Sequence, residues 1–165
     1  MTHRSIRRKD RQLPQEEALA ILERGTYGVL AVTGDEGWPY AVPMNYIFLD
    51  GNLYLHCAKE GHMLESIARE ERVCFTVVTR GELIPNHITA LYESVIVFGV
   101  AALVEDEEER LSVLEALVDI LGSVSPEIKA QYIQSKGAKT GLVRIQPTQI
   151  TGKANKNYIP VTKRM

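Results

Sequence analysis

The segment spanning residues 40–63 constrains the fold of this chain more than any other. Asp50-Gly51 stands between two stretches rich in apolar residues, which is a strong signal for a tight hairpin between two antiparallel strands. The second strand ends near His56, and a glycine-containing turn then leads into a helix that begins near His62. Backbone N–H groups point outward at the start of a helix, so this corner could hold the phosphate of a cofactor.

Hydrophobic periodicity along the rest of the chain predicts about six strands, with helices at early, middle and late positions. Hairpins in the first half and one late helical insertion argue against a regular βαβ alternation. A mainly β (α+β) fold, a six-stranded antiparallel barrel with flanking helices, is the most economical arrangement, and an open sheet packed on helices is the alternative. Strands are expected at residues 27–33, 38–49, 52–57, 73–79, 91–104 and 140–152, helices at 15–24, 62–71, 105–121 and 125–135, a loop at 81–90, and a bulge or bend at Gly99.

Length and charge limit the possible organisation and partners. With 165 residues, 45% hydrophobic and 24% charged, the chain predicts a single domain over residues 1–165, with a basic arm at 1–13 and a polar tail at 154–165. A net charge of −2 argues against a nucleic-acid-binding surface, and the basic arm lacks interleaved aromatic residues.

The sequence also predicts a cytoplasmic location. No apolar run approaches the ~20 residues that a membrane helix needs, and the N-terminal segment lacks the apolar core of a secretion signal. Cys57 and Cys74 have no CxxC spacing, which favours reduced thiols over a disulfide or a zinc site.

Several residues near the predicted corner could carry chemistry. His56 and His62 flank the strand-to-helix turn, but their spacing matches no zinc signature. Cys57 has no evident base nearby in the sequence and is expected to pack or to line a cofactor. Asn45 is polar within an apolar strand, and either a ligand hydrogen bond or a solvent-facing position would explain it. Rossmann and P-loop fingerprints are missing from the sequence.

Five segments taken in order are similar to one family of flavoproteins. They are R-R-K-D-R-Q-L, Y-G-V-L-A-V-T, W-P-Y-A-V-P-M-N-Y, H-C-A-K-E-G-H-M and Y-E-S-V-I-V-F-G, between Arg7 and about Lys153. Together they resemble the nitroimidazole-resistance-like branch of the pyridoxamine 5′-phosphate oxidase-related flavoproteins. The resemblance implies an FMN-binding split β-barrel that works as a homodimer and binds FMN in clefts between the subunits.

The resemblance also implies a set of cofactor-binding residues and a reaction. The first strand of the hairpin would follow the flavin ring and ribityl chain, the second strand would line the next wall, and the helix start would approach the phosphate. Relatives commonly carry a lysine where this chain has Met63. The implied reaction is reduction of a small nitroaromatic such as a 5-nitroimidazole, with His62 as the candidate catalytic residue. The implied cofactor-binding residues are Tyr40, Val42, Pro43, Met44, Asn45, His56, Cys57, Ala58, Gly61, His62 and Met63.

Two other functions remain possible from the sequence. The first is a non-catalytic protein that binds flavin, or binds haem through His56 or His62. The second is a pyridoxamine phosphate oxidase proper, which is disfavoured because W-P-Y-A-V-P-M-N lacks the arginine and lysine that phosphate-bearing ligands would need there.

Overall fold

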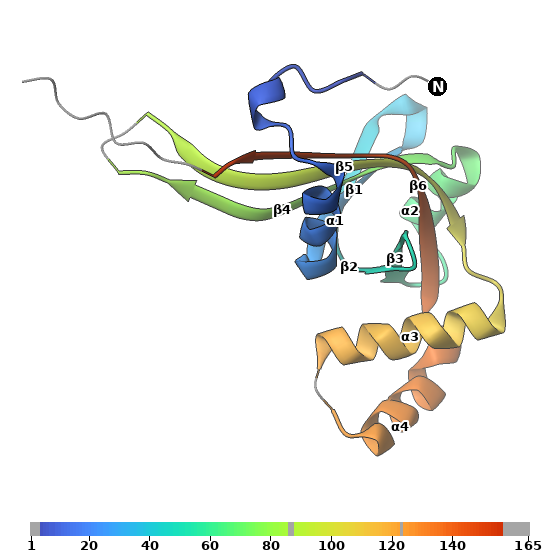
Figure 1. The fold of residues 1–165 in the computed structure, drawn as a ribbon. Helices are drawn as coiled ribbons and strands as arrows, with labels where there is room; N and C mark the ends of the chain where they lie inside the picture. Colours follow the sequence, from blue (N-terminus) through green and yellow to red (C-terminus); the bar gives the residue numbers. More distant parts are fainter. Residues whose placement is uncertain (1–3, 86–87, 123, 157–165) are drawn as a thin grey trace, which may run out of the picture.

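The computed structural model describes residues 4–85, 88–122 and 124–156, and within them six antiparallel strands close into a barrel (Figure 1). The strand order is β1-β2-β3-β6-β5-β4, and the pairing of β1 with β4 closes the ring. This confirms the predicted barrel and excludes an open sheet. The strands are β1 Tyr27–Thr33, β2 Pro39–Leu49, β3 Asn52–Cys57, β4 Arg72–Leu83, β5 Ala90–Leu103 and β6 Gly141–Asn155. The helices are α1 Gln15–Arg24, α2 His62–Arg69, α3 Glu107–Leu121 and α4 Pro126–Lys136.

The predicted hairpin between β2 and β3 is confirmed. Asp50 and Gly51 both have left-handed backbone conformations, with φ of 49° and 78°. Such a pair forms the turn whose twist matches the flanking strands, and Leu49 pairs directly with Asn52 across it. The turn therefore fixes the register in which β3 delivers its last residues to the start of α2.

Two apolar clusters hold the barrel and its helices together. The inner cluster fills the barrel and includes Leu30, Phe75 and Val97, each with no exposed surface, and α1 packs against it through Leu22. The second cluster lies on the outer side of β2 and β3, where α3 covers Tyr54. Figure 1 shows α3 and α4 as a separate helical layer beside this end of the barrel.

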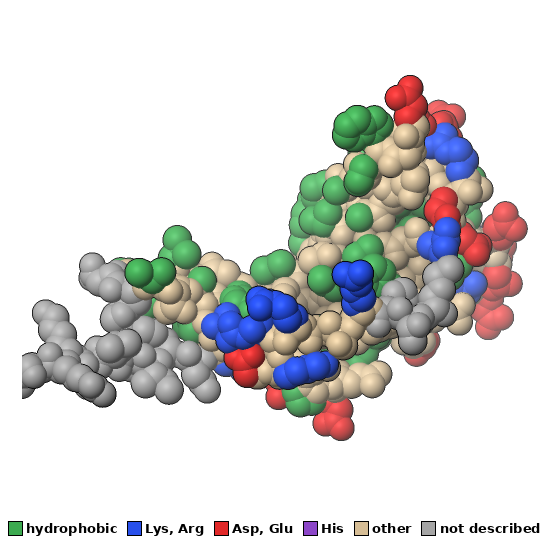
Figure 2. Space-filling view, turned by 90° about the horizontal axis from the view of Figure 1, so that it is seen from above, with side chains coloured by type: hydrophobic (Ala, Val, Ile, Leu, Met, Phe, Trp, Pro, Cys, Tyr) green, Lys and Arg blue, Asp and Glu red, His purple; other side chains and the backbone are tan. Residues whose placement is uncertain are grey.

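The predicted loop at residues 81–90 is shorter than expected. β4 continues to Leu83 because Gly81, Glu82 and Leu83 pair with the start of β5, and these pairings extend the ladder where the sequence shows no period. The result is an arm of paired strands that projects from the barrel (Figure 1). Leu83 and Ile88 are exposed near its tip, and hydrophobic side chains lie on the arm beside basic ones (Figure 2).

Other boundaries differ from prediction by a few residues. α2 ends at Arg69 rather than 71, because β4 already begins at Arg72. β6 runs two residues into the expected polar tail, and Ala154 is buried there. The expected bulge is confirmed by a register shift between Phe98 and Gly99. A Cβ atom at Gly99 would lie 2.6 Å from the Gln146 carbonyl oxygen, so this close approach requires glycine.

Candidate functional site

Strand β2 changes partner halfway along, which leaves part of one edge open. Residues 39–45 pair with β1, whereas only residues 46–49 pair with β3. In the described chain no strand covers the β3-facing side of the first half of β2. This opening is the split in the barrel, and it exposes a stretch of backbone that a ligand could reach.

The two prolines of β2 fit this open edge. Tyr46 donates its backbone N–H to the Thr26 carbonyl oxygen, so even-numbered residues of this half point their backbone groups toward β1. Odd-numbered residues, including Pro39, Ala41 and Pro43, therefore point theirs toward the open side. Proline has no N–H and is tolerated at such an edge, where the ladder needs no donor. The edge accordingly offers the Ala41 N–H and the carbonyl groups of Pro39, Ala41 and Pro43.

Helix α2 begins beside this edge with its first N–H groups uncapped. Gly61 occupies the N-cap position with φ of 130°, and no side chain caps the helix. Glu65 is the first residue whose N–H bonds back to Gly61, so the amides of His62, Met63 and Leu64 precede the hydrogen-bonded turns. Uncapped amides together with the positive end of the helix dipole favour an anion such as a phosphate.

Side-chain contacts fasten the start of α2 to β2. The His62 ring stacks on the Tyr40 ring with centroids 4.4 Å apart and planes 20° from parallel. The Asp35 carboxylate lies 3.4 Å from His62 Nε2 and accepts a hydrogen bond from Arg69 at 2.7 Å. A Cβ atom at Gly34 would come within 3.1 Å of Tyr40 Cβ, so glycine leaves room for this stack.

Asp35 and Arg69 are residues of this corner that the sequence reasoning missed. His62 and Arg69 are seven positions apart, which is two turns of helix and places both on one face. The seven-residue spacing of His62 and Arg69, together with the acidic turn immediately before β2, could have indicated that Asp35 and Arg69 lie near His62. The contacts of Asp35 with His62 and Arg69 are exposed to solvent and add little to the stability of the fold. Their effect is to orient the imidazole ring of His62.

Some of the other predicted site residues face the inside of the barrel, and the rest face outward or lie in a connecting loop. Met44, Cys57 and Met63 pack, partly buried, against the inner cluster. Val42 is half-buried on the same side of β2, whereas Pro43 is exposed on the outer side. Asn45 donates its amide to the Thr26 carbonyl oxygen at 3.1 Å. Ala58 and Gly61 are exposed in the connection between β3 and α2.

His56 is the predicted site residue whose side chain points elsewhere. It precedes Cys57 on β3, and neighbouring residues of a strand face opposite sides. The Cys57 side chain meets the inner cluster, whereas the His56 side chain lines a cavity with residues of α3 and α4. The strand end can thus contribute the His56 backbone to the corner, while its imidazole belongs to the helical layer.

Cys57 and Cys74 are expected to react slowly with thiol reagents. Both are half-buried, and burial raises the pKa of each thiol, because the thiolate is poorly solvated there. At pH 8 the folded chain should react with Ellman's reagent severalfold more slowly than reduced glutathione, and at the same rate once unfolded in urea. Rapid reaction of the folded chain would contradict the assignment of Cys57 as a packing residue.

The described part of the chain has no cluster of side chains suited to binding a metal ion. Among residues 4–85, 88–122 and 124–156, no three His, Cys, Asp or Glu side chains are grouped so that they could hold a metal ion. Within the same residues, no helix is long and apolar enough to cross a membrane.

Comparisons with known proteins identify the family. No curated protein matches the chain. Residues 14–154 match the family model for pyridoxamine 5′-phosphate oxidase. A Bacteroides thetaiotaomicron protein provisionally described as a 5-nitroimidazole antibiotic resistance protein is 25% identical, with a TM-score of 0.73 over 87% of this chain and 86% of that one.

Two further solved structures share the fold at lower identity. An FAD-binding protein of Mesorhizobium loti is 23% identical, with a TM-score of 0.64 over 88% of this chain and 98% of that one. An FAD- and heme-binding protein of Mycobacterium smegmatis is 15% identical, with a TM-score of 0.71 over 92% and 77%. Since the family match spans most of its length, the chain belongs to the pyridoxamine 5′-phosphate oxidase family.

Proposed function

We propose that this chain is a cytoplasmic FMN-binding oxidoreductase that reduces small nitroaromatic compounds. One observation carries the proposal: an open strand edge with a free amide lies beside an uncapped helix start, in a chain of this family. The names of the similar structures, which refer to FAD binding and to 5-nitroimidazole resistance, support a flavin and a nitroaromatic substrate.

The residues at this corner fit the two ends of FMN. The amides of His62, Met63 and Leu64 would bind the phosphate, with Gly61 in the turn beside it. The open edge of β2 would face the ring system, since a flavin ring carries both hydrogen-bond donors and acceptors and the edge presents both kinds of group. Residues proposed along the ring and ribityl chain are Tyr40, Val42, Pro43, Met44, Asn45, Cys57 and Ala58, with the backbone of His56.

FMN, when bound, supplies reversible electron transfer, and the protein supplies orientation and proton handling. Reduction of a nitro group consumes protons as well as electrons. His62 is the proposed proton donor because its imidazole is partly exposed and held in place by Tyr40 and Asp35. Asp35 acts as a positioning residue, since it contacts the imidazole and not the substrate.

Absorbance of the purified protein tests the cofactor. A flavin spectrum, with release of FMN identified by mass spectrometry, is the expected result. Protein purified without cofactor should take up added FMN with quenching of its fluorescence. Colourless protein that leaves FMN fluorescence unchanged would remove the proposal, and a Soret band after haem addition in such protein would favour haem binding instead.

A homodimer is the proposed assembly, and an apolar outer face supports it. Five residues of this face are exposed on adjacent strands of the barrel, at 36% to 60% of their surface. Val29 pairs with Thr76, which pairs with Ile96, so the side chains form rows across β1, β4 and β5. A second copy would remove this surface from water. The apolar outer face comprises Tyr27, Val29, Val78, Ile96 and Phe98.

Ile96→Glu is expected to weaken the dimer at least tenfold, because it would bury an unpaired carboxylate between the copies. Sedimentation velocity over a range of protein concentrations measures the change. Ile120→Glu is the matched control: Ile120 is 50% exposed on α3, away from the apolar outer face. Identical sedimentation of the two variants would contradict this interface.

A further inference from the structure

Two cations and a tyrosine form a cluster on the outer side of β5 and β6, the Tyr92 cluster, which comprises Arg11, Tyr92 and Lys153. Lys153 of β6 pairs with Ser94 of β5, and Tyr92 lies two residues from Ser94 on the same face of the strand. Arg11 reaches this face from the segment before α1 and donates to the Tyr92 hydroxyl oxygen at 3.3 Å. The Arg11 guanidinium carbon lies 5.8 Å from the centre of the Tyr92 ring, and Lys153 Nζ lies 5.5 Å from it. Both positive charges are thus held against one ring.

The backbone fixes these three residues relative to one another. Arg11 ends a short 3-10 turn, and Gln12 then forms a bridge with Lys153. The Leu13 N–H donates to the Gly152 carbonyl oxygen at 2.9 Å. Figure 1 shows this segment above β5 and β6. Because the groups are in place before a ligand arrives, binding a ligand there would cost little ordering of the protein.

Neither cation of the Tyr92 cluster has a carboxylate partner in the described part of the chain. The nearby carboxylates are each paired with a different cation: Asp10 with Arg8, Glu93 with Arg24, and Glu17 with Lys156. Figure 2, seen from the side of the N-terminal segment, shows Lys and Arg side chains gathered on this face, with most acidic ones toward its right-hand side. Two like charges held close together repel each other, so the cluster favours an added anion.

The Tyr92 hydroxyl responds to these charges. Partial burial raises its pKa, but the hydrogen bonds and charges of Arg11 and Lys153 outweigh burial and leave the pKa below the usual value for a tyrosine. The hydroxyl oxygen accepts from Arg11, so its hydrogen is available to an anion. All three residues are partly exposed, so a ligand in solution can reach them.

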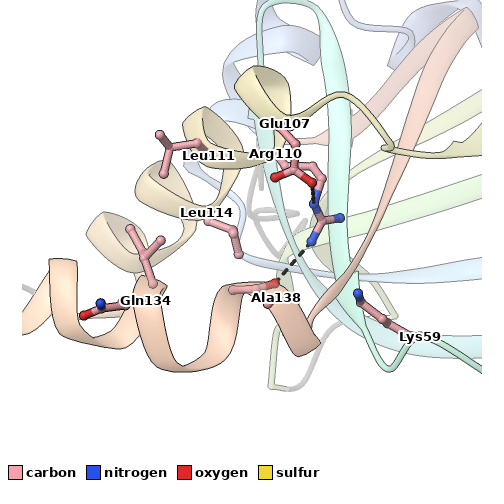
Figure 3. Close-up of a pocket in the computed structure, with 9 residues that line it drawn as sticks. Lys59, Glu107, Arg110, Leu111, Leu114, Gln134 and Ala138 are labelled. Carbon is pink, nitrogen blue, oxygen red and sulfur yellow. Dashed lines mark hydrogen bonds and ion pairs between the residues drawn. The ribbon is translucent and has the colours of Figure 1, made fainter.

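The cation of the helical layer differs, because its donors are already used. Arg110 lines a pocket of about 290 Å³ between α3 and α4. Its guanidinium donates to three carbonyl oxygens, those of Val104, Gly137 and Thr140, at 3.1, 3.2 and 2.9 Å. It also lies 3.9 Å from the Glu107 carboxylate, and Figure 3 shows it between Glu107 and the end of α4. Arg110 therefore fastens the two helices together, whereas the cations of the Tyr92 cluster fasten nothing of opposite charge.

We propose that the Tyr92 cluster binds a phosphate group with two negative charges, either free or at the end of a small organic molecule. Arg11 would make a forked contact, Lys153 would add the second positive charge, and the Tyr92 hydroxyl would donate a hydrogen bond. A dianion matches two cations, whereas a carboxylate would leave one of them uncompensated. Within one subunit this site is separate from the proposed FMN phosphate site. Gly141 at one end of β6 pairs with the strand that leads to α2, and the cluster lies toward the other end.

Two ligands of matched shape test the charge. At about pH 7.5 phenyl phosphate is mostly a dianion, whereas phenyl sulfate carries a single charge. Titrations followed by ¹⁵N NMR at constant ionic strength should show saturable shifts of the Tyr92 and Lys153 amides, with phenyl phosphate binding about tenfold more tightly. Inorganic phosphate in the same titration distinguishes the source. An affinity at least equal to that of phenyl phosphate indicates free phosphate, and a lower affinity indicates an organic phosphate.

Variants that remove one charge test the residues. Lys153→Met and Arg11→Gln should each weaken phenyl phosphate at least tenfold, because each removes one charge-assisted contact. Tyr92→Phe keeps the ring and should weaken it severalfold. Lys9→Met is the matched control: Lys9 lies in the same turn as Arg11, but its ammonium group bonds to a glutamine side chain. It should change the affinity less than twofold.

Three results would overturn the proposal. They are equal affinity for phenyl phosphate and phenyl sulfate, equal weakening by Lys9→Met and Lys153→Met, and shifts confined to the amides of residues 62–64. The last result would leave the proposed FMN site intact. Conversely, Lys153→Met should lose phenyl phosphate from the Tyr92 cluster while FMN binds at α2 as in the parent, so the two sites can fail independently.

Discussion

Replacing Met63 with lysine is expected to tighten the binding of FMN about tenfold to a hundredfold. Met63 is the second residue of α2 and is half-buried against the inner cluster. A lysine can keep this apolar contact with its aliphatic stem while its ammonium group reaches outward. A charge-assisted hydrogen bond to a phosphate contributes about 1.5–3 kcal/mol, and 1.4 kcal/mol corresponds to a factor of ten. Quenching of FMN fluorescence during titration measures the dissociation constant.

The matched control for this variant is Ala68→Lys. Ala68 is exposed near the end of the same helix, so the substitution adds the same charge far from the uncapped amides. Its effect on FMN affinity should be small. The gain from Met63→Lys should also shrink as ionic strength rises, because salt screens an exposed charge pair. Equal effects of the two lysines, or none from Met63→Lys, would place the phosphate somewhere other than the start of α2.

Phe75→Ala is expected to lower the free energy of unfolding by about 3–5 kcal/mol, which is the usual cost of emptying a buried phenylalanine site. Phe75 has no exposed surface and lies edge-on to the Tyr46 ring, with centroids 5.2 Å apart. It also fills the space left by Gly28, whose added Cβ would lie 2.4 Å from the Phe75 ring. Domains are commonly stable by only about 5–15 kcal/mol, so the variant should lose much of its stability.

Urea denaturation followed by circular dichroism measures this loss. Leu83→Ala is the control: Leu83 is 85% exposed on the arm, and truncating it should change the unfolding free energy by less than about 0.5 kcal/mol. If Phe75→Ala were as stable as Leu83→Ala, the inner cluster would not be the core of the barrel.

Much of the fold could be predicted because local signals agreed with the final pairing. Asp50-Gly51 specified a turn type, and the β2–β3 register followed from it. The arm could not be predicted, because residues 81–83 are strand only through their pairing with residues 90–92, and no local period marks them. The pairing of β1 with β4, which closes the barrel, joins segments that are far apart in the sequence. A local sequence pattern does not predict such a pairing.

The site was only partly predictable for a related reason. The strand-to-helix corner was visible as a strand end, a glycine and a helix start, and the structure places Tyr40 and His62 in contact there. His56 was grouped with this corner because it is close in sequence. Because side chains alternate between the two faces of β3, the His56 side chain points toward α3 and α4. It lines a cavity there and does not lie at the corner.

Amide hydrogen exchange with and without FMN locates the flavin on the protein. Slower exchange is expected at the Ala41 amide and at the amides of residues 62–64 when FMN is added, because these groups would become hydrogen-bonded to the ligand. The amides of β6 near Ile145, already paired with β5, should not change. Saturable FMN binding that leaves Ala41 and residues 62–64 unprotected would contradict the placement of the flavin at this edge and this helix start.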